Sequence, residues 1–469
     1  MKFVKLASLL LAGTTGLAAC ADQATSPVAS AVPSMNEAQA EAARHIFIFS
    51  SPTIPADFAA RVGAAGGTVE KTFDAIRIAS VRGLTPEAAA SLGAAADVAH
   101  WNNDVAMTLS LPGEEPQAEA MGDAAASEAA SASNPTTASF YPRQWHLRQI
   151  GADKAWAAGR LGSPTVKVGI LDTGLDYRHP DLAGRVDLSL SRSFVPQDNA
   201  LIQAMFPGAH EIADLHYHGT HVGATVSSNA LAAAGVTSQV TLVGLKVLDR
   251  NGNGNSFNTL DAIVYAADAG LDVINMSLGV QVPLARREYA WFNEMINRAT
   301  NYAQSRGMTV IVSAGNENMN LDALRNGFKA YCTATQVICI SATGPTSQTS
   351  VNGPWTNIDS KASYSNYGRA FVDFAAPGGN GVSRVTAACS GFSVVQPVCR
   401  TGTFVLGING TSMASPHATA LAALLVEQYG RNPGAIRAAL VRSSDDLGQA
   451  GNDPVYGQGR INVATALGL

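Results

Sequence analysis

Six short runs of apolar residues, five of which end in small or polar residues, most constrain how this chain can fold. The runs are near-continuous, which is typical of parallel strands buried on both faces of a sheet. Helical stretches at residues 259–270 and 291–307 lie between them, and each ends in glycine. The pattern predicts an α/β fold: a doubly wound, mostly parallel sheet with helices on both faces and a ligand site beyond the carboxyl ends of its strands. The runs are residues 166–172, 240–248, 271–279, 308–316, 336–344 and 371–378.

Length and charge narrow the class of protein. The chain has 469 residues, of which 46% are hydrophobic, so it is long enough for two domains or more. Its formal net charge is −5, and its lysines and arginines form no cluster in the sequence. A protein that binds nucleic acid usually carries such a basic cluster, so nucleic acid is not an expected partner.

The N-terminus predicts export. Residues 1–19 contain two lysines, an apolar stretch and then small residues, which is typical of a secretory signal peptide and too short for a permanent membrane-spanning helix. The stretch Leu17-Ala18-Ala19-Cys20 resembles the lipobox of bacterial lipoproteins. That resemblance implies a lipid on Cys20 as the only membrane attachment, at the outer membrane or cell surface. The alternative is an ordinary signal peptide whose cleavage site happens to precede a cysteine.

The remaining sequence divides into four segments. Residues 20–43 are rich in Ala, Ser, Gln and Pro and predict a flexible tether. Residues 44–110 have the strand and helix order β-α-β-β-α-β, which predicts a small α+β, ferredoxin-like domain. Residues 111–139 lack hydrophobic periodicity and predict an exposed, easily cut linker. Residues 140–469 hold the apolar runs of the larger domain.

Three residues near predicted strand and helix ends have the groups that acyl transfer needs. Asp172 ends the run 166–172, and His218 and Ser412 stand at the starts of two predicted helices. A serine just before an apolar helix is usually a helix cap, so capping is the alternative for Ser412. A serine hydroxyl becomes a nucleophile when an imidazole takes its proton and a carboxylate orients that imidazole. The order Asp, His, Ser is one of the known triad orders, and it differs from that of the α/β-hydrolases.

With its motifs in this order, the chain resembles the subtilisin-like serine proteases, or subtilases, from about Trp145 to Leu467. The motifs are DTGLDYRHPDL, HGTHVGATV, INMSLG, SAGNEN, ASYSNYG, DFAAPG, GTSMASPH and GQGRINVATAL. The resemblance implies a serine endopeptidase that forms an acyl-enzyme intermediate. In it, Asp172 orients the imidazole, His218 is general base and acid, and Ser412 is the nucleophile.

The resemblance also implies further site residues. Asn316 matches the oxyanion-hole side chain, His221 matches a structural histidine, and Glu317 lies at the rim of the primary side-chain pocket, where it would tolerate a basic residue. Two extended segments match the walls between which a substrate peptide lies as an added strand. These wall residues are Gly252, Asn253 and Gly254, and Ser277, Leu278 and Gly279.

Cysteine usage agrees with export. Of the five cysteines, Cys20 is assigned to the lipid, and the other four form two close pairs in the sequence. An oxidising compartment favours disulfides Cys332–Cys339 and Cys389–Cys399, and free buried thiols are the alternative.

Catalysis requires no cofactor in this interpretation. Asp181 matches a calcium ligand of many subtilases, but the stretch after His218 offers few oxygen side chains, so the sequence does not support a structural calcium site. The stretch 249–255 begins like an EF-hand, yet its twelfth position is Leu260, where calcium needs a glutamate. It predicts a glycine-rich turn and no metal site.

The small domain at residues 44–110 resembles the inhibitor-like propeptide of many subtilases; an unrelated ferredoxin-like adaptor is the alternative. The resemblance implies a self-processing zymogen cut between roughly Leu111 and Phe140, which would release the catalytic domain from its anchor. We expect a monomer whose partners are protein or peptide substrates and its own propeptide. The alternative function is a catalytically inert surface module that binds peptides.

Overall fold

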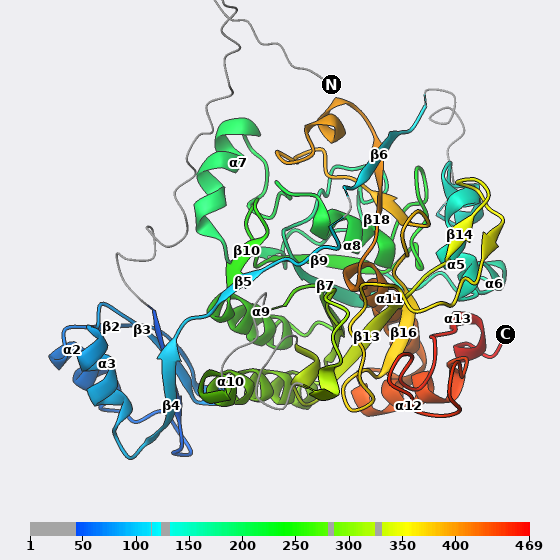
Figure 1. Ribbon diagram of the computed structural model, residues 1–469. Coiled ribbons are helices and arrows are strands. Elements are labelled where there is room, and N and C mark those ends of the chain that lie inside the picture. The colour runs from blue at the N-terminus through cyan, green and yellow to red at the C-terminus, as the bar shows by residue number, and fades with distance from the viewer. Residues whose placement is uncertain (1–43, 114, 123–131, 280–285, 324–330) are drawn as a thin grey trace, which may run out of the picture. The chain divides into compact units, whose positions relative to one another are not determined.

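The computed structural model describes residues 44–113, 115–122, 132–279, 286–323 and 331–469 (Figure 1). The predicted signal peptide, the tether and Cys20 lie outside these residues, so the lipid anchor stays a prediction. Among the described helices, none has the length and apolar character needed to cross a membrane.

The first described segment folds as a small α+β unit. Its four strands form one antiparallel sheet in the order β2-β3-β1-β4. Two helices pack on this sheet around a core that includes Phe47, Phe49 and Phe58. Thr85 caps the second helix by accepting a hydrogen bond from Ala88 N. The elements are β1 (His45–Phe49), α2 (Phe58–Ala64), β2 (Thr68–Phe73), β3 (Ile78–Arg82), α3 (Pro86–Gly93) and β4 (Val98–Asn103).

The larger part is built on a seven-stranded sheet in the order β16-β13-β12-β11-β7-β9-β8, in which every neighbouring pair is parallel. Each of the six predicted apolar runs contains one strand of this sheet, and the two-residue β8 is the strand that the pattern did not predict. The strands are β7 (Lys167–Asp172), β8 (Arg192–Ser193), β9 (Thr241–Lys246), β11 (Val273–Met276), β12 (Thr309–Ser313), β13 (Val337–Thr343) and β16 (Phe374–Pro377).

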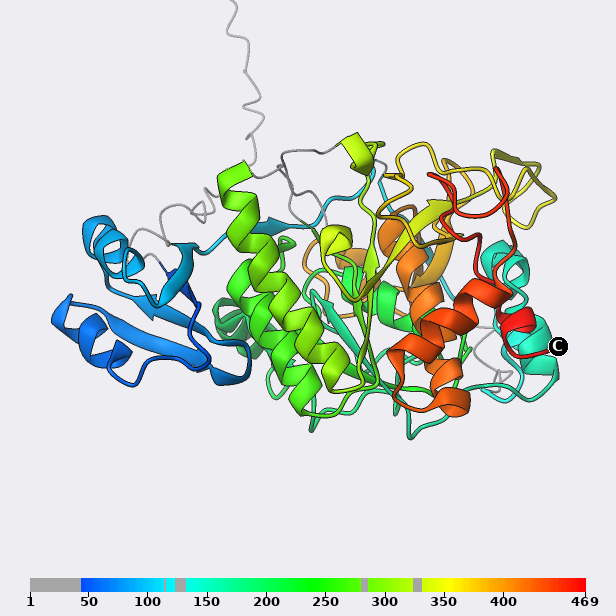
Figure 2. The ribbon, with the colours of Figure 1, turned by 90° about the horizontal axis from the view of Figure 1, so that it is seen from below.

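Helices cover both faces of this sheet, as Figures 1 and 2 show. Along β12, Ile311 packs in the core that contains α11 (Thr411–Tyr429), whereas Val310 and Val312 pack in the core that contains α9 (Ser256–Asp268) and α10 (Arg286–Ser305). Burial on both sides explains why the strands are near-continuous apolar runs. The predicted doubly wound α/β fold is confirmed.

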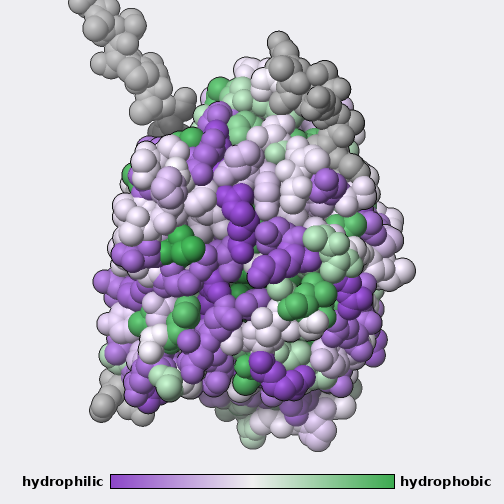
Figure 3. All heavy atoms as spheres, turned by 90° about the vertical axis from the view of Figure 1, so that its right-hand side faces the viewer, coloured by the Kyte–Doolittle hydropathy of each residue, from purple (hydrophilic) through white to green (hydrophobic). Residues whose placement is uncertain are grey.

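Hydrophobic side chains on the face shown in Figure 3 are scattered in small patches among hydrophilic ones.

Shorter elements complete the described part of the chain. The remaining helices are α5 (Trp145–Gln149), α6 (Ala152–Ala157), α7 (Asn199–Met205), α8 (His218–Val226), α12 (Pro433–Ser443) and α13 (Val463–Ala466). The remaining strands are β5 (Ala106–Thr108), β6 (Gln117–Ala120), β10 (Asn253–Asn255), β14 (Ser347–Gln348), β15 (Trp355–Thr356), β17 (Val385–Ala388) and β18 (Phe404–Ile408).

Part of the predicted linker is a strand. Within residues 111–139, which the sequence predicts to be irregular, β6 pairs antiparallel with β18 and extends the β17-β18 pair to a three-stranded sheet. All four β6 residues are exposed, so no hydrophobic alternation marks the strand in the sequence. Backbone pairing with a distant edge forms it.

Both predicted disulfides are confirmed, Cys332–Cys339 and Cys389–Cys399. The second closes a loop that lies against the chain just before His218. In this loop, Ser390 Oγ donates to the Asp214 carbonyl at 2.7 Å, and Val394 N donates to the Leu215 carbonyl at 2.8 Å. The disulfide therefore restrains a loop that supports the segment leading into α8.

Replacing Cys389 and Cys399 together with serine should lower the free energy of unfolding by roughly 2–3 kcal/mol, because the unfolded chain regains the entropy of an open loop. Urea unfolding of the two proteins measures this difference. A variant that unfolds at the wild-type urea concentration would contradict a stabilising role for this disulfide.

Candidate active site

A buried histidine and carboxylate meet at the carboxyl end of the central sheet. Asp172 is the last residue of β7, and His218 is the first residue of α8. Neither side chain is exposed, and His218 Nδ1 lies 2.8 Å from Asp172 Oδ1 and 3.0 Å from Oδ2. The carboxylate favours a proton on Nδ1, which leaves Nε2 as an acceptor. His218 Nε2 has no hydrogen-bond partner among the described residues, so it can take a proton from a nucleophile.

Glycine allows the start of α8 to approach the end of β7. A Cβ at Gly219 would lie 2.2 Å from the Gly174 carbonyl oxygen and 3.1 Å from Asp172 Cβ. Gly219 N also donates to Thr173 Oγ1 at 2.9 Å. Any side chain at position 219 would therefore push His218 away from its carboxylate.

Ser412 is the second residue of the long helix α11 and is only 4% exposed. The N-cap position belongs to Gly410, and no side chain caps the helix there. Ser412 is therefore not the N-cap residue. Helix α8, which begins with His218, packs against α11.

Asn316 connects the start of α11 to a peptide carbonyl from the small unit. Its Oδ1 accepts hydrogen bonds from Thr411 N at 2.9 Å and from Thr411 Oγ1 at 2.8 Å. These two donors fix the orientation of the side-chain amide. Asn316 Nδ2 then donates to the carbonyl oxygen of Ser110 at 2.5 Å.

The chain before Ser110 lies in the site as an added strand. Strand β5 pairs antiparallel with β10, with Thr108 opposite Asn253 and Met107 opposite Gly254. Leu109 N continues the pairing by donating to the Gly252 carbonyl at 2.9 Å. Residues 252–254 thus bind an extended peptide, and that peptide is part of the same chain.

The side chains of this segment also enter the site. Met107 is fully buried, and Tyr331 Oη lies 3.7 Å from its sulfur. Ser110 Oγ donates to Glu317 Oε1 at 2.8 Å, so the glutamate that the sequence associates with a basic residue contacts a small hydroxyl. Asn366 Nδ2 donates to Glu317 Oε2 at 2.8 Å and holds the carboxylate in place.

Ser277 supports the helix start. Its hydroxyl donates to the Ser412 carbonyl at 2.9 Å and lies 2.8 Å from Ser415 Oγ. Leu278 is 4% exposed and belongs to the core with α9 and α10. A substrate-binding role for Ser277, Leu278 and Gly279 stays a prediction.

A buried charge network lies beside the carboxylate. Lys246 pairs with Asp172 in the register of β7 and β9 and is fully buried. Its ammonium forms an ion pair with Asp198 at 3.0 Å and donates to the Thr173 carbonyl at 2.6 Å. Asp214 accepts from Thr173 Oγ1 at 2.8 Å, and burial raises the pKa of its carboxyl. No local sequence pattern marks these residues, because the ion pair and hydrogen bonds join positions that are far apart in the chain.

The carboxylates considered for calcium are engaged by backbone N–H groups. Asp181 Oδ1 accepts from Leu231 N and Ala232 N, and its Oδ2 accepts from Ala233 N. Asp249 Oδ1 accepts from two backbone N–H groups of its own glycine-rich turn. In the part of the chain that the structure describes, no group of three or more His, Cys, Asp or Glu side chains is placed to hold a metal ion.

Several histidines around the site are kept neutral by burial. His221 Nε2 lies 3.2 Å from the Val385 carbonyl and 3.1 Å from the Leu406 carbonyl, and burial lowers its pKa to about 3. His417 lies on α11 with its Nε2 2.8 Å from His146 Nδ1, and burial lowers the pKa of His417 to about 4.

Comparisons with known proteins identify the family of this chain. The sequence model described as "Subtilase family" matches residues 163–459. The chain is 33% identical over 340 residues to a thermophilic serine proteinase of Bacillus sp. (strain AK1), covering 72% of this chain and 70% of that protein. It is 31% identical to thermitase of Thermoactinomyces vulgaris, covering 71% of this chain and 99% of that protein.

Its fold is similar to the crystal structure of the epidermin leader peptide processing serine protease from Staphylococcus aureus. The TM-score is 0.69, the identity is 19%, and the match covers 91% of this chain and 98% of that one.

Acid should destabilise the folded protein through the neutral histidines. His221 and His417 have folded pKa values of about 3 and about 4, below the ordinary value of 6.5, so the unfolded chain binds protons first as the pH falls. The contribution of each neutral histidine to the free energy of unfolding is therefore fully present above pH ~6.5. It decreases toward pH ~4, by up to about 1.4 kcal/mol per pH unit for each histidine.

Urea unfolding of the Ser412→Ala protein between pH 8 and 4 measures this slope without self-digestion. When His417→Gln is added to the Ser412→Ala protein, the free energy of unfolding should depend less steeply on pH, by the contribution of one histidine. An equal slope in both proteins would contradict the assignment for His417.

Proposed function

Since the chain belongs to the subtilase family and is a serine endopeptidase, we propose that it is made as a zymogen that cuts its own Ser110–Leu111 bond. The catalytic residues are Asp172, His218 and Ser412. The observation that carries this proposal is the 2.5 Å hydrogen bond from Asn316 Nδ2 to the Ser110 carbonyl. Asn316 Oδ1 also accepts from Thr411, the residue before Ser412, and this supports the Ser110 carbonyl as the group that Ser412 attacks.

The proposed reaction uses the chain's own groups at each step. Ser412 Oγ attacks the Ser110 carbonyl carbon while His218 Nε2 takes the hydroxyl proton. Asp172 stabilises the imidazolium, and Asn316 Nδ2 donates to the oxyanion that forms on the Ser110 oxygen. The imidazolium then gives its proton to the Leu111 nitrogen, and the peptide bond breaks. Water, deprotonated by His218, releases Ser110 from the acyl-enzyme.

Contacts outside the cleft support an inhibitory role for residues 44–110 before and after the cut. Lys71 Nζ lies 2.6 Å from Asp261 Oδ1. Asp104 accepts hydrogen bonds from Ser256 Oγ at 2.6 Å and from Phe257 N at 3.0 Å. Residues 256 and 257 begin α9, and a carboxylate at a helix N-terminus is stabilised by the helix dipole. These contacts do not depend on the Ser110–Leu111 bond, so the cut alone leaves the cleft occupied.

Substrates are proteins or peptides, and the cleft favours an extended one. We propose that the primary pocket accepts a small hydroxyl residue such as Ser110, because Glu317 Oε1 accepts a hydrogen bond from the Ser110 hydroxyl. With a lipid on Cys20, the cut would also separate the anchored residues from the catalytic domain. Catalytic protein found only in membrane fractions would contradict that release.

The Ser412→Ala protein should remain at full length, because no nucleophile is present to attack Ser110. Wild-type protein incubated at neutral pH should instead yield a catalytic fragment whose first residue is Leu111. Intact mass and N-terminal sequencing distinguish the two, and Ser444→Ala, directly after α12, is the control for a serine outside the site. If both proteins remain whole, the inert peptide-binding module becomes the better interpretation.

Asn316→Ala should lower kcat by about 10²–10³-fold, the loss typical when one oxyanion donor is removed, with a smaller effect on KM. Hydrolysis of a peptide anilide by the mature enzyme measures both constants. Asn320→Ala, four residues further along the same loop, is the matched control. A KM increase with an unchanged kcat would show that Asn316 only binds substrate.

A further inference from the structure

The chain continues from the Ser110–Leu111 bond to a second contact on the catalytic domain. Leu111 packs against the larger core, and the Glu115 carbonyl accepts a hydrogen bond from Arg384 Nη1. Strand β6 then pairs antiparallel with β18, with Gln117 opposite Gly407 and Ala120 opposite Phe404. The segment on the leaving side of the proposed cut is thus attached at its far end.

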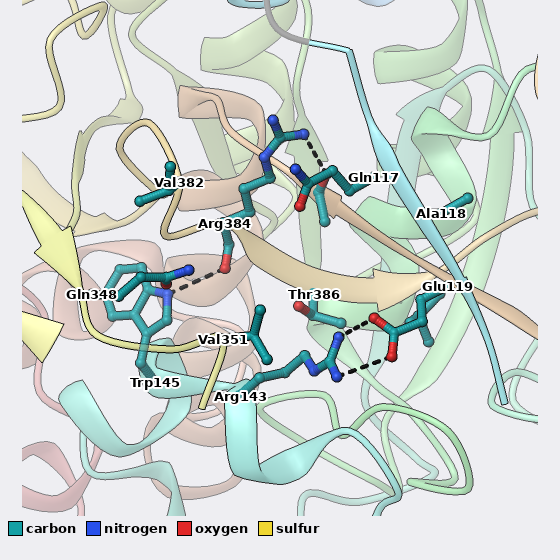
Figure 4. Close-up of a pocket in the computed structure, with 12 residues that line it drawn as sticks. Gln117, Ala118, Glu119, Arg143, Trp145, Gln348, Val351, Val382, Arg384 and Thr386 are labelled. Carbon is teal, nitrogen blue, oxygen red and sulfur yellow. Dashed lines mark hydrogen bonds and ion pairs between the residues drawn. The ribbon is translucent and has the colours of Figure 1, made fainter. Parts of the chain in front are cut away.

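A charge pair accompanies this strand. Arg143, in the 3-10 turn Tyr141–Arg143 of the catalytic domain, binds the Glu119 carboxylate with both terminal nitrogens (Figure 4). One of the two bonds, Nη2 to Oε1, measures 3.0 Å. The Arg143 guanidinium also lies 4.8 Å from the centre of the Phe140 ring, which holds it in place. A two-pronged bond of this kind adds geometric selectivity to the charge attraction.

A second arginine lies near this pair. A pocket lies between β6, β17, β18 and the loops at Gln348 and Val382, and its charged lining residues are Arg143, Arg384 and Glu119. Figure 4 shows Gln117, Ala118 and Glu119 along one side of it and the two arginines on the other. Arg143 therefore favours an extended segment that carries an acidic residue opposite it.

We propose that the edge of β18, together with Arg143, is a docking site for the leaving side of the first cut. This inference rests on the proposed function and deepens it. The occupant is the chain's own segment Gln117–Ala120, in which Glu119 is the ninth residue after Ser110. Main-chain pairing holds the segment, and the Arg143–Glu119 pair selects its register.

The docking site acts by effective concentration. With residues 44–110 bound on one side of the cleft and β6 bound on the other, the bond between Ser110 and Leu111 is held at both ends. The second attachment shortens the free chain on the leaving side of this bond, so the bond is near Ser412 for a larger fraction of the time. This raises the cleavage rate, although the docking site does not touch the reacting atoms. Arg143 is accordingly a positioning residue. After the cut, the mature protein begins at Leu111 and keeps β6 on β18.

Charge reversal tests the pair. In the full-length chain made by cell-free translation, Arg143→Glu and Glu119→Arg should each slow self-cleavage about fivefold, and the double variant should return to within twofold of wild type. The rate is the conversion of full-length chain to the Leu111 fragment. This rate is divided by the kcat/KM of the same variant for a Met-Thr-Leu-Ser anilide, which has the sequence of residues 107–110. The anilide is too short to reach β18, so its hydrolysis reports only on the active site.

A proline pair tests the strand. Met121 N donates to the Thr403 carbonyl, so the alternation of an antiparallel ladder directs the amides of Gln117 and Glu119 to β18 and that of Ala118 to the solvent. Gln117→Pro should therefore slow the normalised cleavage more than Ala118→Pro, since only the first removes a pairing donor.

The outcomes separate this inference from the proposed function. If wild type produces no Leu111 terminus, the proposed function fails. A second outcome overturns only the docking site. In it, wild type cuts before Leu111, the single charge variants keep the wild-type ratio of self-cleavage rate to kcat/KM, and Gln117→Pro and Ala118→Pro slow cleavage equally. Single variants that are slow with no recovery in the double variant also overturn the charge pair.

Discussion

Helix α11 begins inside the protein, and Asn316 supplies the hydrogen-bond partner that its first N–H group lacks within the helix. Its residues from Thr411 to Val426 are all buried, and the Gly410 N-cap position has no side chain to accept from the first turn. Buried N–H groups without partners cost free energy, so other groups must approach the helix. Asn316 does so by accepting from Thr411 N, and the same bond turns its Nδ2 toward the Ser110 carbonyl. One requirement of helix formation thus places an amide donor against a peptide carbonyl oxygen, which is what the proposed oxyanion role of Asn316 needs.

The parallel sheet supplies the second requirement, which is that distant residues meet. Because neighbouring strands run in the same direction, their carboxyl ends share one edge, and Asp172 at the end of β7 meets Lys246 at the end of β9. Gly219 then allows α8 to bring His218 onto Asp172. The buried Lys246–Asp198 pair and the loop closed by Cys389–Cys399 support the segments around this edge.

Much of the fold was predictable from local patterns, and the exceptions have a common cause. Every apolar run contained a strand, because burial on both faces leaves a continuous apolar sequence. Helix α9 begins before its predicted range because Asn255 caps it, accepting from Asn258 N. Strand β6 had no signal, since its side chains are exposed and only its backbone pairs. The sequence around Lys246 does not show that this lysine is buried, because its ion-pair partner Asp198 lies in a different segment of the chain.

The sequence by itself determined the chemistry: the candidate nucleophile, base, carboxylate and amide, the paired cysteines and the fold that orders them. These features lie in short motifs, and the residue types and spacing of those motifs are sufficient to identify the candidate residues. Only the tertiary structure decided which peptide carbonyl binds Asn316, that Glu317 contacts a serine hydroxyl, and that residues 117–120 pair with β18. Each of these depends on contacts between residues that are far apart in the chain, such as Ser110 and Asn316, which are separated by 206 positions. Such contacts form only when the whole fold brings the segments together.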